Sequence, residues 1–227
     1  MCMDKKQNEN LNETQEKDRY RLRIWSAAAL LILFLYIAGT VAVGRTGTLD
    51  AIGFNVAFGL RGPASEWLLT KITFCGGPVA ILSCLVVLLI LPWTRKTIAT
   101  RAAITGIIGF VGYRVLKTLF ARPRPDALFW LVTEHGYSFP SGHSMNGMIC
   151  YGIVAFLACR ELTRAGHERW AAVVVGILTP LIGLIGLSRV FVGVHYFTDV
   201  LAGFALGGAY LLAATVVWDR LIFDRQK

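Results

Sequence analysis

Charged residues are scarce in this sequence. Asp, Glu, Lys and Arg make up 16% of the 227 residues, whereas hydrophobic residues make up 55%. That is more apolar surface than one soluble core of this length needs. Internal repeats and low-complexity segments are also missing. The composition therefore excludes an ordinary soluble domain and indicates a membrane protein.

Cysteine pairs of the kind that bind metals or exchange electrons are missing too. The five cysteines include no CxxC pair, and Cys84, Cys150 and Cys159 lie inside apolar stretches. Cysteine in such a stretch acts as a small apolar residue. The sequence therefore predicts neither a cysteine metal site nor a redox site.

Six apolar blocks dominate the chain, each about as long as the roughly 20 helical residues that cross a bilayer. They run from Ile24 to Val43, Phe74 to Trp93, Ala102 to Phe120, Gly142 to Cys159, Ala171 to Phe191 and Val200 to Trp218. We expect an all-α integral membrane bundle of six transmembrane helices, formed by residues 24–227 as a single domain.

Two segments fall outside these blocks. The tail from Met1 to Arg23 has six basic and five acidic residues and few apolar ones. We expect it to be disordered or to form a helix on the membrane surface. The segment from Gly44 to Cys75 is not expected to span the membrane, although its apolar residues predict an interfacial helix.

The net charge of +9 arises from basic residues in short loops beside the apolar blocks, rather than from one polar face. We therefore expect no nucleic-acid partner. With the N-terminus inside, 15 of the 23 basic residues fall in cytoplasmic segments and 8 fall outside. Both termini are therefore expected to be cytoplasmic, in a multi-pass protein of the cell (inner) membrane.

Ionisable residues at helix ends are costly in a membrane, so they mark candidate functional sites. The first set follows the third block, where Lys117 and Arg124 stand seven residues apart. Pro123 and Pro125 disfavour helix at the residues before them, so the helix should end near Ala121. Lys117 and Arg124 are then expected to converge on one anion. Arg114 and Arg122 are as easily explained as headgroup anchors.

The second set begins the fourth block and reads Pro140-Ser141-Gly142-His143. Proline near a helix start, serine as a possible N-cap and glycine for close ligand approach describe a helix N-terminus that binds an anion. Taken alone, the segment fits equally well a capped membrane helix with a histidine beside the cap.

The third set joins the fifth and sixth blocks and contains Arg189, His195 and Asp199. His195 and Asp199 are four residues apart, so on a helix they share a face and the carboxylate can accept a hydrogen bond from the imidazole. That bond fixes the tautomer and leaves the other ring nitrogen free to attack. A pair that only satisfies itself at a helix end remains the alternative.

The three sets lie on the same expected side of the membrane and together match the needs of phosphoryl transfer. That reaction needs positive charge around the phosphate oxygens, an in-line nucleophile and an acid for the leaving oxygen. His195 is the expected nucleophile, Asp199 its orienting partner and His143 the general acid. The expected phosphate-binding residues are Lys117, Arg124, Ser141, Gly142 and Arg189.

The three sets resemble the tripartite signature of the type 2 phosphatidic acid phosphatases. The matching segments are Lys117-x6-Arg124-Pro125, Pro140-Ser141-Gly142-His143 and Ser188-Arg189-x5-His195-x3-Asp199. The resemblance implies a metal-independent phosphatase with a phosphohistidine intermediate, without a cofactor. Ser138 to Asn146 and Arg124-Pro125-Asp126 are similar to segments of bacterial phosphatidylglycerophosphate and undecaprenyl pyrophosphate phosphatases. Vanadate haloperoxidases carry a similar signature but are soluble.

The expected partner is a lipid phosphate or pyrophosphate, bound at the outer, periplasmic side among the membrane lipids. A lipid phosphotransferase with the same phosphoenzyme, acting for example on lipid A, is the first alternative. A transporter or channel would place its charges nearer the midplane. A zinc hydrolase with His143, His195 and Asp199 as ligands would bring the metal close to three cations. The sequence leaves the individual lipid and the oligomeric state open.

Overall fold

The computed structural model describes the backbone of residues 2–223 and the side chains of residues 14–221, and in this part of the chain it contains helices and no strand. The helices are α1 (Cys2–Ala42), α2 (Gly47–Gly59), α3 (Pro63–Cys75), α4 (Pro78–Ile90), α5 (Pro92–Thr94), η1 (Arg95–Ala99), α6 (Thr100–Phe120), η2 (Ala127–Phe129), α7 (Gly142–Arg164), α8 (Glu168–Phe191) and α9 (Phe197–Phe223). Here η1 is a π-helical turn and η2 a 3₁₀ turn.

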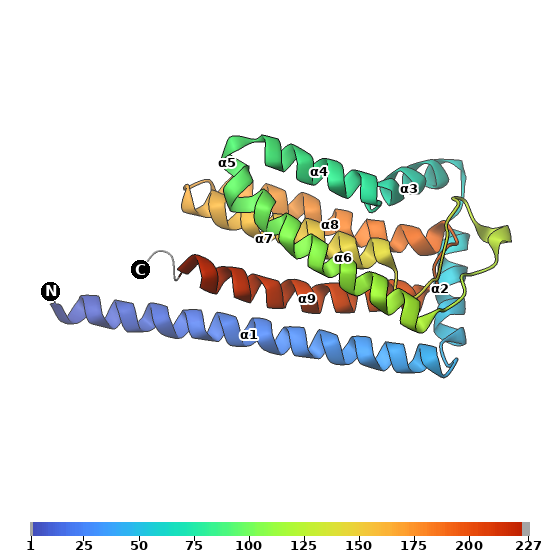
Figure 1. The fold of residues 1–227 in the computed structure, drawn as a ribbon, viewed down its shortest axis with the longest axis horizontal. Coiled ribbons are helices and arrows are strands. Elements are labelled where there is room, and N and C mark those ends of the chain that lie inside the picture. The colour runs from blue at the N-terminus through green and yellow to red at the C-terminus, as the bar shows by residue number, and fades with distance from the viewer. Residues whose placement is uncertain (1, 224–227) are drawn as a thin grey trace.

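The long helices run side by side in an elongated bundle, and α2 crosses one end of it (Figure 1). Within the described residues, five helical stretches are long and apolar enough to cross a membrane, and there are six when the bent pair α3–α4 is counted as one span. Large apolar side chains such as Tyr36, Ile107 and Ile177 are exposed on the outside of the bundle. Such a surface suits lipid rather than water. The expected all-α fold with six spans is confirmed.

The second span differs from the expected block from Phe74 to Trp93. It consists of α3 and α4, which meet at a bend of 55°. Pro63 and Pro78 each occupy a helix start, and Gly76 and Gly77 separate the two helices. The expected block from Phe74 to Trp93 therefore includes only the last two residues of α3, because the break at Gly76 and Gly77 divides the helical stretch and hydropathy does not reveal it.

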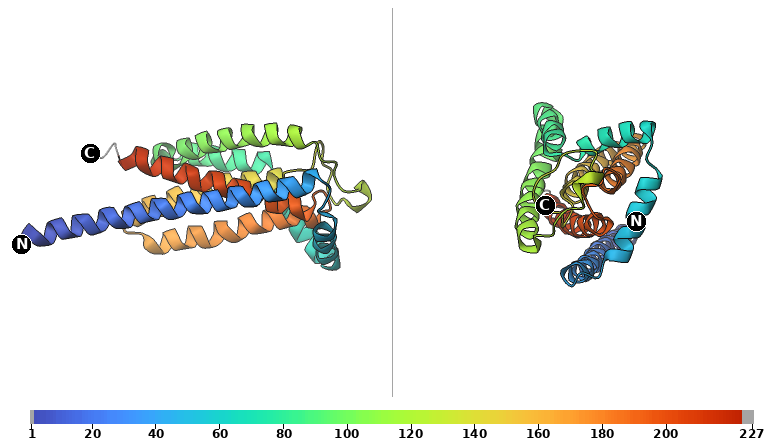
Figure 2. Two further views of the ribbon diagram at one scale, coloured as in Figure 1. Left: turned by 90° about the horizontal axis from the view of Figure 1, so that it is seen from below. Right: turned by 90° about the vertical axis from the view of Figure 1, so that its right-hand side faces the viewer.

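The N-terminal tail was expected to be disordered or to form a helix on the membrane surface, and in the structure it is helical from Cys2 onward. Helix α1 begins at Cys2 and continues without interruption into the first span. Figure 2 shows its N-terminal part projecting beyond the other helices. Extending an existing helix costs far less than nucleating one, and Glu, Gln, Lys and Arg are good helix formers. The hydroxyl of Tyr20 also donates to Glu16 Oε1 at 2.8 Å, one helical turn away.

Helix α7 is the centre of the bundle. It packs against α6, α8 and α9, and α1 lies along the outside of α9. Ile149, Ile153 and Leu157 recur along one face of α7 and are fully buried. Their spacing of four residues is that of a helix face turned to a core. Packing on three sides fixes the position of the N-terminus of α7, where the second set of polar residues begins.

We expect Gly186→Ala to destabilise the bundle. A Cβ atom at Gly186 of α8 would lie 2.1 Å from Cζ of Phe204 on α9. Overpacking of this kind typically costs about 1–3 kcal/mol. The measurement is the thermal unfolding midpoint in detergent.

Gly183→Ala is the matched control on the same helix, because a Cβ atom there meets no other atom within 4 Å. Equal midpoints for the two variants would show that α8 and α9 do not pack as described.

Candidate active site

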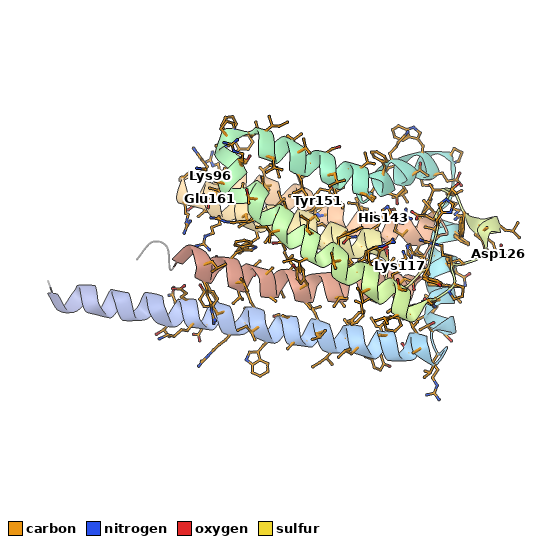
Figure 3. The ribbon with its side chains drawn as sticks, in the orientation of Figure 1. Lys96, Lys117, Asp126, His143, Tyr151 and Glu161 are labelled. Carbon is orange, nitrogen blue, oxygen red and sulfur yellow. The ribbon has the colours of Figure 1, made fainter. Side chains whose placement is uncertain are left out.

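The polar sets of the sequence meet at the end of the bundle that α2 crosses. Lys117 lies in the last turn of α6, and His143 lies in the first turn of α7. Figure 3 shows both side chains toward this end, with Asp126 in the loop beyond it and Lys96 and Glu161 at the opposite end. The candidate site residues therefore lie at one end of the bundle, and Lys96 and Glu161 lie at the other end.

The prolines after α6 turn the chain as the sequence predicts. Helix α6 ends at Phe120, and Ala121 adopts a left-handed conformation with φ of 45°. Its N–H donates to the carbonyl of Lys117 at 3.2 Å. Arg122 and Arg124 consequently lie on non-helical chain, from which their side chains reach toward α9 and the loop before it.

His195 is held on both ring nitrogens and is 1% exposed. Its Nδ1 lies 3.3 Å from Oδ2 of Asp199 and 3.3 Å from Oγ of Ser138. Its Nε2 lies 3.2 Å from Nη1 of Arg124. Arginine only donates, so an attractive contact requires an unprotonated Nε2. The proton then sits on Nδ1 and faces the carboxylate, which leaves a lone pair on Nε2.

The surroundings of His195 also favour the neutral ring. Burial lowers the pKa of His195 well below its ordinary value, and the nearby charges of Arg124, Arg189 and Lys117 lower the pKa further. Each cation opposes a second positive charge on the ring. A neutral imidazole with a free lone pair is the nucleophilic form of histidine.

Asp199 is fully buried and accepts hydrogen bonds from several sides. Its Oδ2 accepts from the hydroxyl of Ser138 and, at 2.9 Å, from the N–H of Tyr196. Its Oδ1 accepts from Nη1 of Arg122 at 2.6 Å. The carboxylate is therefore fixed in position and orients His195. The histidine–carboxylate contact that the sequence predicts is present, although α9 begins only at Phe197.

Arg122 has a role that the sequence did not reveal. Besides Asp199 it contacts Asp50 of α2, with 2.7 Å between Nη2 and Oδ2. Asp50 is buried and also accepts from the N–H and the hydroxyl of Thr198. The guanidinium lies 4.0 Å from the centre of the Tyr196 ring. The interpretation of Arg122 as a headgroup anchor is therefore wrong, because two buried carboxylates hold it inside the protein.

A signal for this network is present in the sequence. Asp50 is the one acidic residue between Gly44 and Leu60, in an otherwise apolar stretch. Such a residue needs a buried partner. Which of the many arginines pairs with Asp50 depends on how α2 crosses the bundle, and sequence spacing does not give that.

Arg124 is held over His195 by backbone groups. Its Nη1 donates to the carbonyl of Val194 at 2.8 Å, and its Nε donates to the carbonyl of Gly136 at 3.0 Å. Its Nη2 lies 3.4 Å from Oε2 of Glu134. The guanidinium is thus preorganised beside the nucleophilic nitrogen, as an anion-binding group should be.

Arg189 is the second cation of the site and is 1% exposed. Its Nη1 donates to the hydroxyl of Thr73 on α3 at 2.6 Å, and its Nη2 pairs with Oε1 of Glu134. Its Nε is buried and has no hydrogen-bond partner among the residues that the structure describes. An orphaned buried donor is costly, so a ligand that accepts from it would be favoured.

Lys117 is the third cation and depends on Gly142. The ammonium of Lys117 donates to the hydroxyl of Tyr113 at 2.8 Å. A Cβ atom at Gly142 would lie 2.5 Å from that hydroxyl oxygen. Only glycine at this position lets Tyr113 approach α7 so closely. In this structure Gly142 therefore makes room for Tyr113 rather than for a ligand.

Ser141 caps α7. Its Oγ accepts from the N–H of Ser144 at 3.5 Å, and its own N–H donates to the carbonyl of Asp199 at 3.0 Å. Its hydroxyl is therefore engaged in the helix start, and it joins α7 to α9. The next N–H groups of α7 remain at a helix N-terminus, where partial positive charge favours an anion.

His143 follows this cap and lies against the break between α3 and α4. A Cβ atom at Gly76 would meet Cδ2 of His143 at 2.9 Å. Within the described part of the chain, no three His, Cys, Asp or Glu side chains are placed to share a metal ion. His143, His195 and Asp199 therefore lack the arrangement that a zinc site with these three ligands would need.

Glu134 also belongs to this site, although no motif in the sequence pointed to it. Its two carboxylate oxygens contact Arg189 and Arg124, one each. It thus bridges the two guanidinium groups closest to the nucleophile, in the manner of two oxygens of a phosphate. A phosphate bound by these arginines must displace Glu134 or share them with it.

Comparisons with known proteins identify relatives of this chain. The family model of the PAP2 superfamily matches residues 97–223. Phosphatidylglycerophosphatase B of Bacillus subtilis is 31% identical over 192 residues, which are 81% of this chain and 90% of that protein. An undecaprenyl-diphosphatase of Sulfolobus acidocaldarius is 31% identical over 188 residues, which are 78% of this chain and 84% of that protein.

A solved structure shares the fold. The crystal structure of a transmembrane PAP2 type phosphatidylglycerolphosphate phosphatase from Bacillus subtilis aligns with a TM-score of 0.77 and 28% identity, covering 86% of this chain and 97% of the other. The region matched by the family model, residues 97–223, includes every polar residue described above from Lys117 to Asp199.

We expect Glu134→Gln to bind inorganic phosphate about tenfold more tightly, which corresponds to about 1.4 kcal/mol. The substitution removes the negative charge that competes for Arg124 and Arg189 and keeps the size of the side chain. The measurement is the inhibition constant of phosphate as a competitor of aryl phosphate hydrolysis.

Asp126→Asn is the control, because it removes one carboxylate charge from the same loop, where Asp126 only accepts from the N–H of Leu128. Weaker phosphate binding in Glu134→Gln would mean that Glu134 supports the anion site instead of competing in it.

Proposed function

The chain belongs to the PAP2 superfamily, and we propose that it removes the terminal phosphate of a lipid phosphate or pyrophosphate through a phosphohistidine on His195. It is a multi-pass membrane phosphatase, as its spans and its relatives show. The proposal concerns the chemistry, the substrate and the side of the membrane.

The position of His195 Nε2 is the observation that carries the proposal. This nitrogen has a lone pair, lies beside Arg124 at 3.2 Å and belongs to a ring whose other nitrogen faces Asp199. A phosphate held by Arg124 and Arg189 would present its phosphorus to that lone pair. Such pre-alignment of nucleophile and electrophile removes much of the entropic part of the barrier.

The first chemical step forms the phosphoenzyme. Nε2 of His195 attacks phosphorus while the bond from phosphorus to the oxygen of the lipid, or of its remaining phosphate, breaks. His143 gives a proton to that leaving oxygen. Lys117, Arg124, Arg189 and the N–H groups at the start of α7 stabilise the charge on the three equatorial oxygens.

The second step returns the enzyme. Water attacks phosphorus and loses a proton to His143, the bond between phosphorus and Nε2 breaks, and inorganic phosphate leaves. Asp199 stays ionised and stabilises the imidazole while its Nε2 is bonded to phosphorus. Asp199 is therefore a positioning residue, and Arg122 and Ser138 position it in turn.

For the substrate we propose phosphatidylglycerophosphate first and undecaprenyl pyrophosphate second. The relatives that cover most of this chain carry names that refer to these two activities. Both substrates present a terminal phosphate at the membrane surface, where the cations of the site lie. A phosphotransferase would need an acceptor lipid in place of water, and no observation on this chain favours one.

We expect His195→Gln to lose all turnover, because the attacking lone pair is removed. Asp199→Asn should keep a small remaining activity, about 10²- to 10⁴-fold below the wild type, because the carboxylate orients His195 but does not attack phosphorus. The measurement is phosphate release from phosphatidylglycerophosphate, undecaprenyl pyrophosphate, phosphatidic acid and a lipid A phosphate at matched surface concentration, with radiolabelled phosphate trapped on the enzyme by acid-free quenching.

His167→Gln is the matched control, since His167 is exposed before α8 at the other end of the bundle. The nucleophile assignment fails if His195→Gln keeps near wild-type turnover. Turnover restricted to phosphatidic acid or lipid A phosphate would instead overturn the substrate assignment alone.

We also propose that both termini are cytoplasmic and that the site faces the outer, periplasmic side of the cell (inner) membrane. The loops around the site hold few of the 23 basic residues, whereas the opposite end holds most of them. Positively charged loops are retained in the cytoplasm.

We expect Leu128→Cys to react with a membrane-impermeant thiol reagent in intact cells. Leu128 lies in the loop at the site end and is 88% exposed. Labelling above the background of the wild-type cysteines reports the side of the membrane. Labelling only after the cells are lysed would place the site in the cytoplasm and reverse the topology.

A further inference from the structure

A groove of about 1200 Å³ runs between α1, α7, α8 and α9. Along α7 it extends from Met148, in the second turn of the helix, to Arg164, the last residue of the helix. None of the residues described above at the active site lines it. The groove is thus separate from the site of phosphoryl transfer.

The length of the groove matches one leaflet of a membrane. Met148 and Arg164 are 16 residues apart in sequence, which corresponds to a rise of about 24 Å along the helix axis. One leaflet with its headgroups is about 20–22 Å thick, which is half of a whole bilayer. The groove therefore has the length of a lipid that stands in the leaflet farther from the active site.

The two ends of the groove differ in chemistry. The end that lies inside the bundle, nearer the active site, is apolar and is lined by Ile182 of α8 and by Phe204 and Leu211 of α9. The other end, which opens at the surface of the bundle opposite the active site, is charged. It contains four arginines of α1 and α7 and two carboxylates, namely Arg19, Arg23, Arg160, Arg164, Glu16 and Asp219. The mouth of the groove consequently has an excess of positive charge.

The ion pairs at the mouth compensate only part of this positive charge, and Arg164 pairs with Glu161 at 3.6 Å. Arg23 and Arg160 share the single carboxylate of Asp219. Within the described side chains, Arg19 has no ion pair, although it lines the groove. One phosphate group between these arginines would supply the missing negative charge, with charge-assisted hydrogen bonds.

From this combination we propose that the groove binds an anionic phospholipid of the leaflet opposite the active site. The lipid phosphate lies among Arg19, Arg23 and the arginines of α7, and an acyl chain lies along α7 toward Phe204. Basic pockets between transmembrane helices are known to bind acidic headgroups in this way. The inference does not depend on the proposed reaction, because no residue of that reaction takes part.

The charge at the mouth favours a lipid over a helix from a second copy of the chain. A helix brings no phosphate for the arginines that line the mouth.

Two pairs of variants test the proposal. Gly183→Leu fills the groove, since Gly183 lines it and a Cβ atom there meets no other atom within 4 Å. Gly176→Leu, on the same helix but outside the groove, is its control and is equally free of collisions. The double variant Arg19→Gln/Arg164→Gln removes two exposed charges from the mouth, and Arg21→Gln/Arg169→Gln removes two exposed charges beside it.

The experiment is native mass spectrometry of the full chain, delipidated in detergent and mixed with dioleoyl phosphatidylglycerol or dioleoyl phosphatidylcholine. The wild type should retain phosphatidylglycerol more tightly than phosphatidylcholine. Gly183→Leu should lose this preferred adduct, and the mouth variant should weaken it about tenfold while leaving phosphatidylcholine unchanged. Both controls should behave as the wild type. Arg124→Gln should also keep the adduct, which separates the groove from the active site.

The proposal fails if Gly183→Leu and the wild type retain the same phosphatidylglycerol adduct, or if Arg124→Gln is the variant that loses it. It also fails if the wild type is dimeric and Gly183→Leu makes it monomeric, because the groove would then hold a second copy. Turnover of an aryl phosphate in detergent confirms that each groove variant is folded.

Discussion

Asp199 is a buried carboxylate at the end of a membrane bundle, and a charge in that position is stable only when other groups compensate it. Arg122 supplies the opposite charge, and Ser138 and Tyr196 supply hydrogen bonds. The same arginine holds Asp50 of α2, and the backbone carbonyl of Asp199 accepts from Ser141 at the start of α7. One carboxylate thus ties α2, α7, α9 and the loop after α6 together.

The orientation of His195 is a consequence of this arrangement. Because Asp199 cannot move, Nδ1 of His195 is fixed toward it, and Nε2 is fixed toward Arg124. The cations that would bind a phosphate also keep the ring neutral, since each of them lowers its pKa. The proposed nucleophile and the proposed anion site therefore depend on one another. Glu134 neutralises part of the same positive charge when it bridges Arg124 and Arg189.

Helix α7 extends from the candidate active site at one end of the bundle to the mouth of the groove at the other end. Its N-terminus, capped by Ser141, faces the phosphate-binding cations. Its residues from Met148 to Arg164 line the groove, and arginines gather around Asp219 at the mouth of the groove. In a membrane these two ends meet different leaflets, so the chemistry at one end does not compete for lipid with the binding surface at the other. The buried middle of α7, with Ile149 and Ile153, separates the two ends by packing alone.

The sequence by itself determined the class of fold and the residues of the motifs, because both follow from local patterns. Apolar blocks of bilayer length gave the spans, and prolines gave the end of α6 at Phe120. The spacing of His195 and Asp199 gave their contact. The break at Gly76 was missed, since a bent span is two short helices held by packing against Ile185 and His143.

The tertiary structure alone decided which charges pair. Asp50 is 72 residues from Arg122, Thr73 is 116 residues from Arg189, and Glu134 is 55 residues from Arg189. No local periodicity connects residues at such separations. A buried charge is stable only when a partner lies within hydrogen-bonding distance. The way in which the helices cross decides which groups lie within that distance. For that reason the sequence left the role of Arg122 open between a headgroup anchor and a site residue, whereas in the structure Arg122 holds the carboxylate of Asp199 in place.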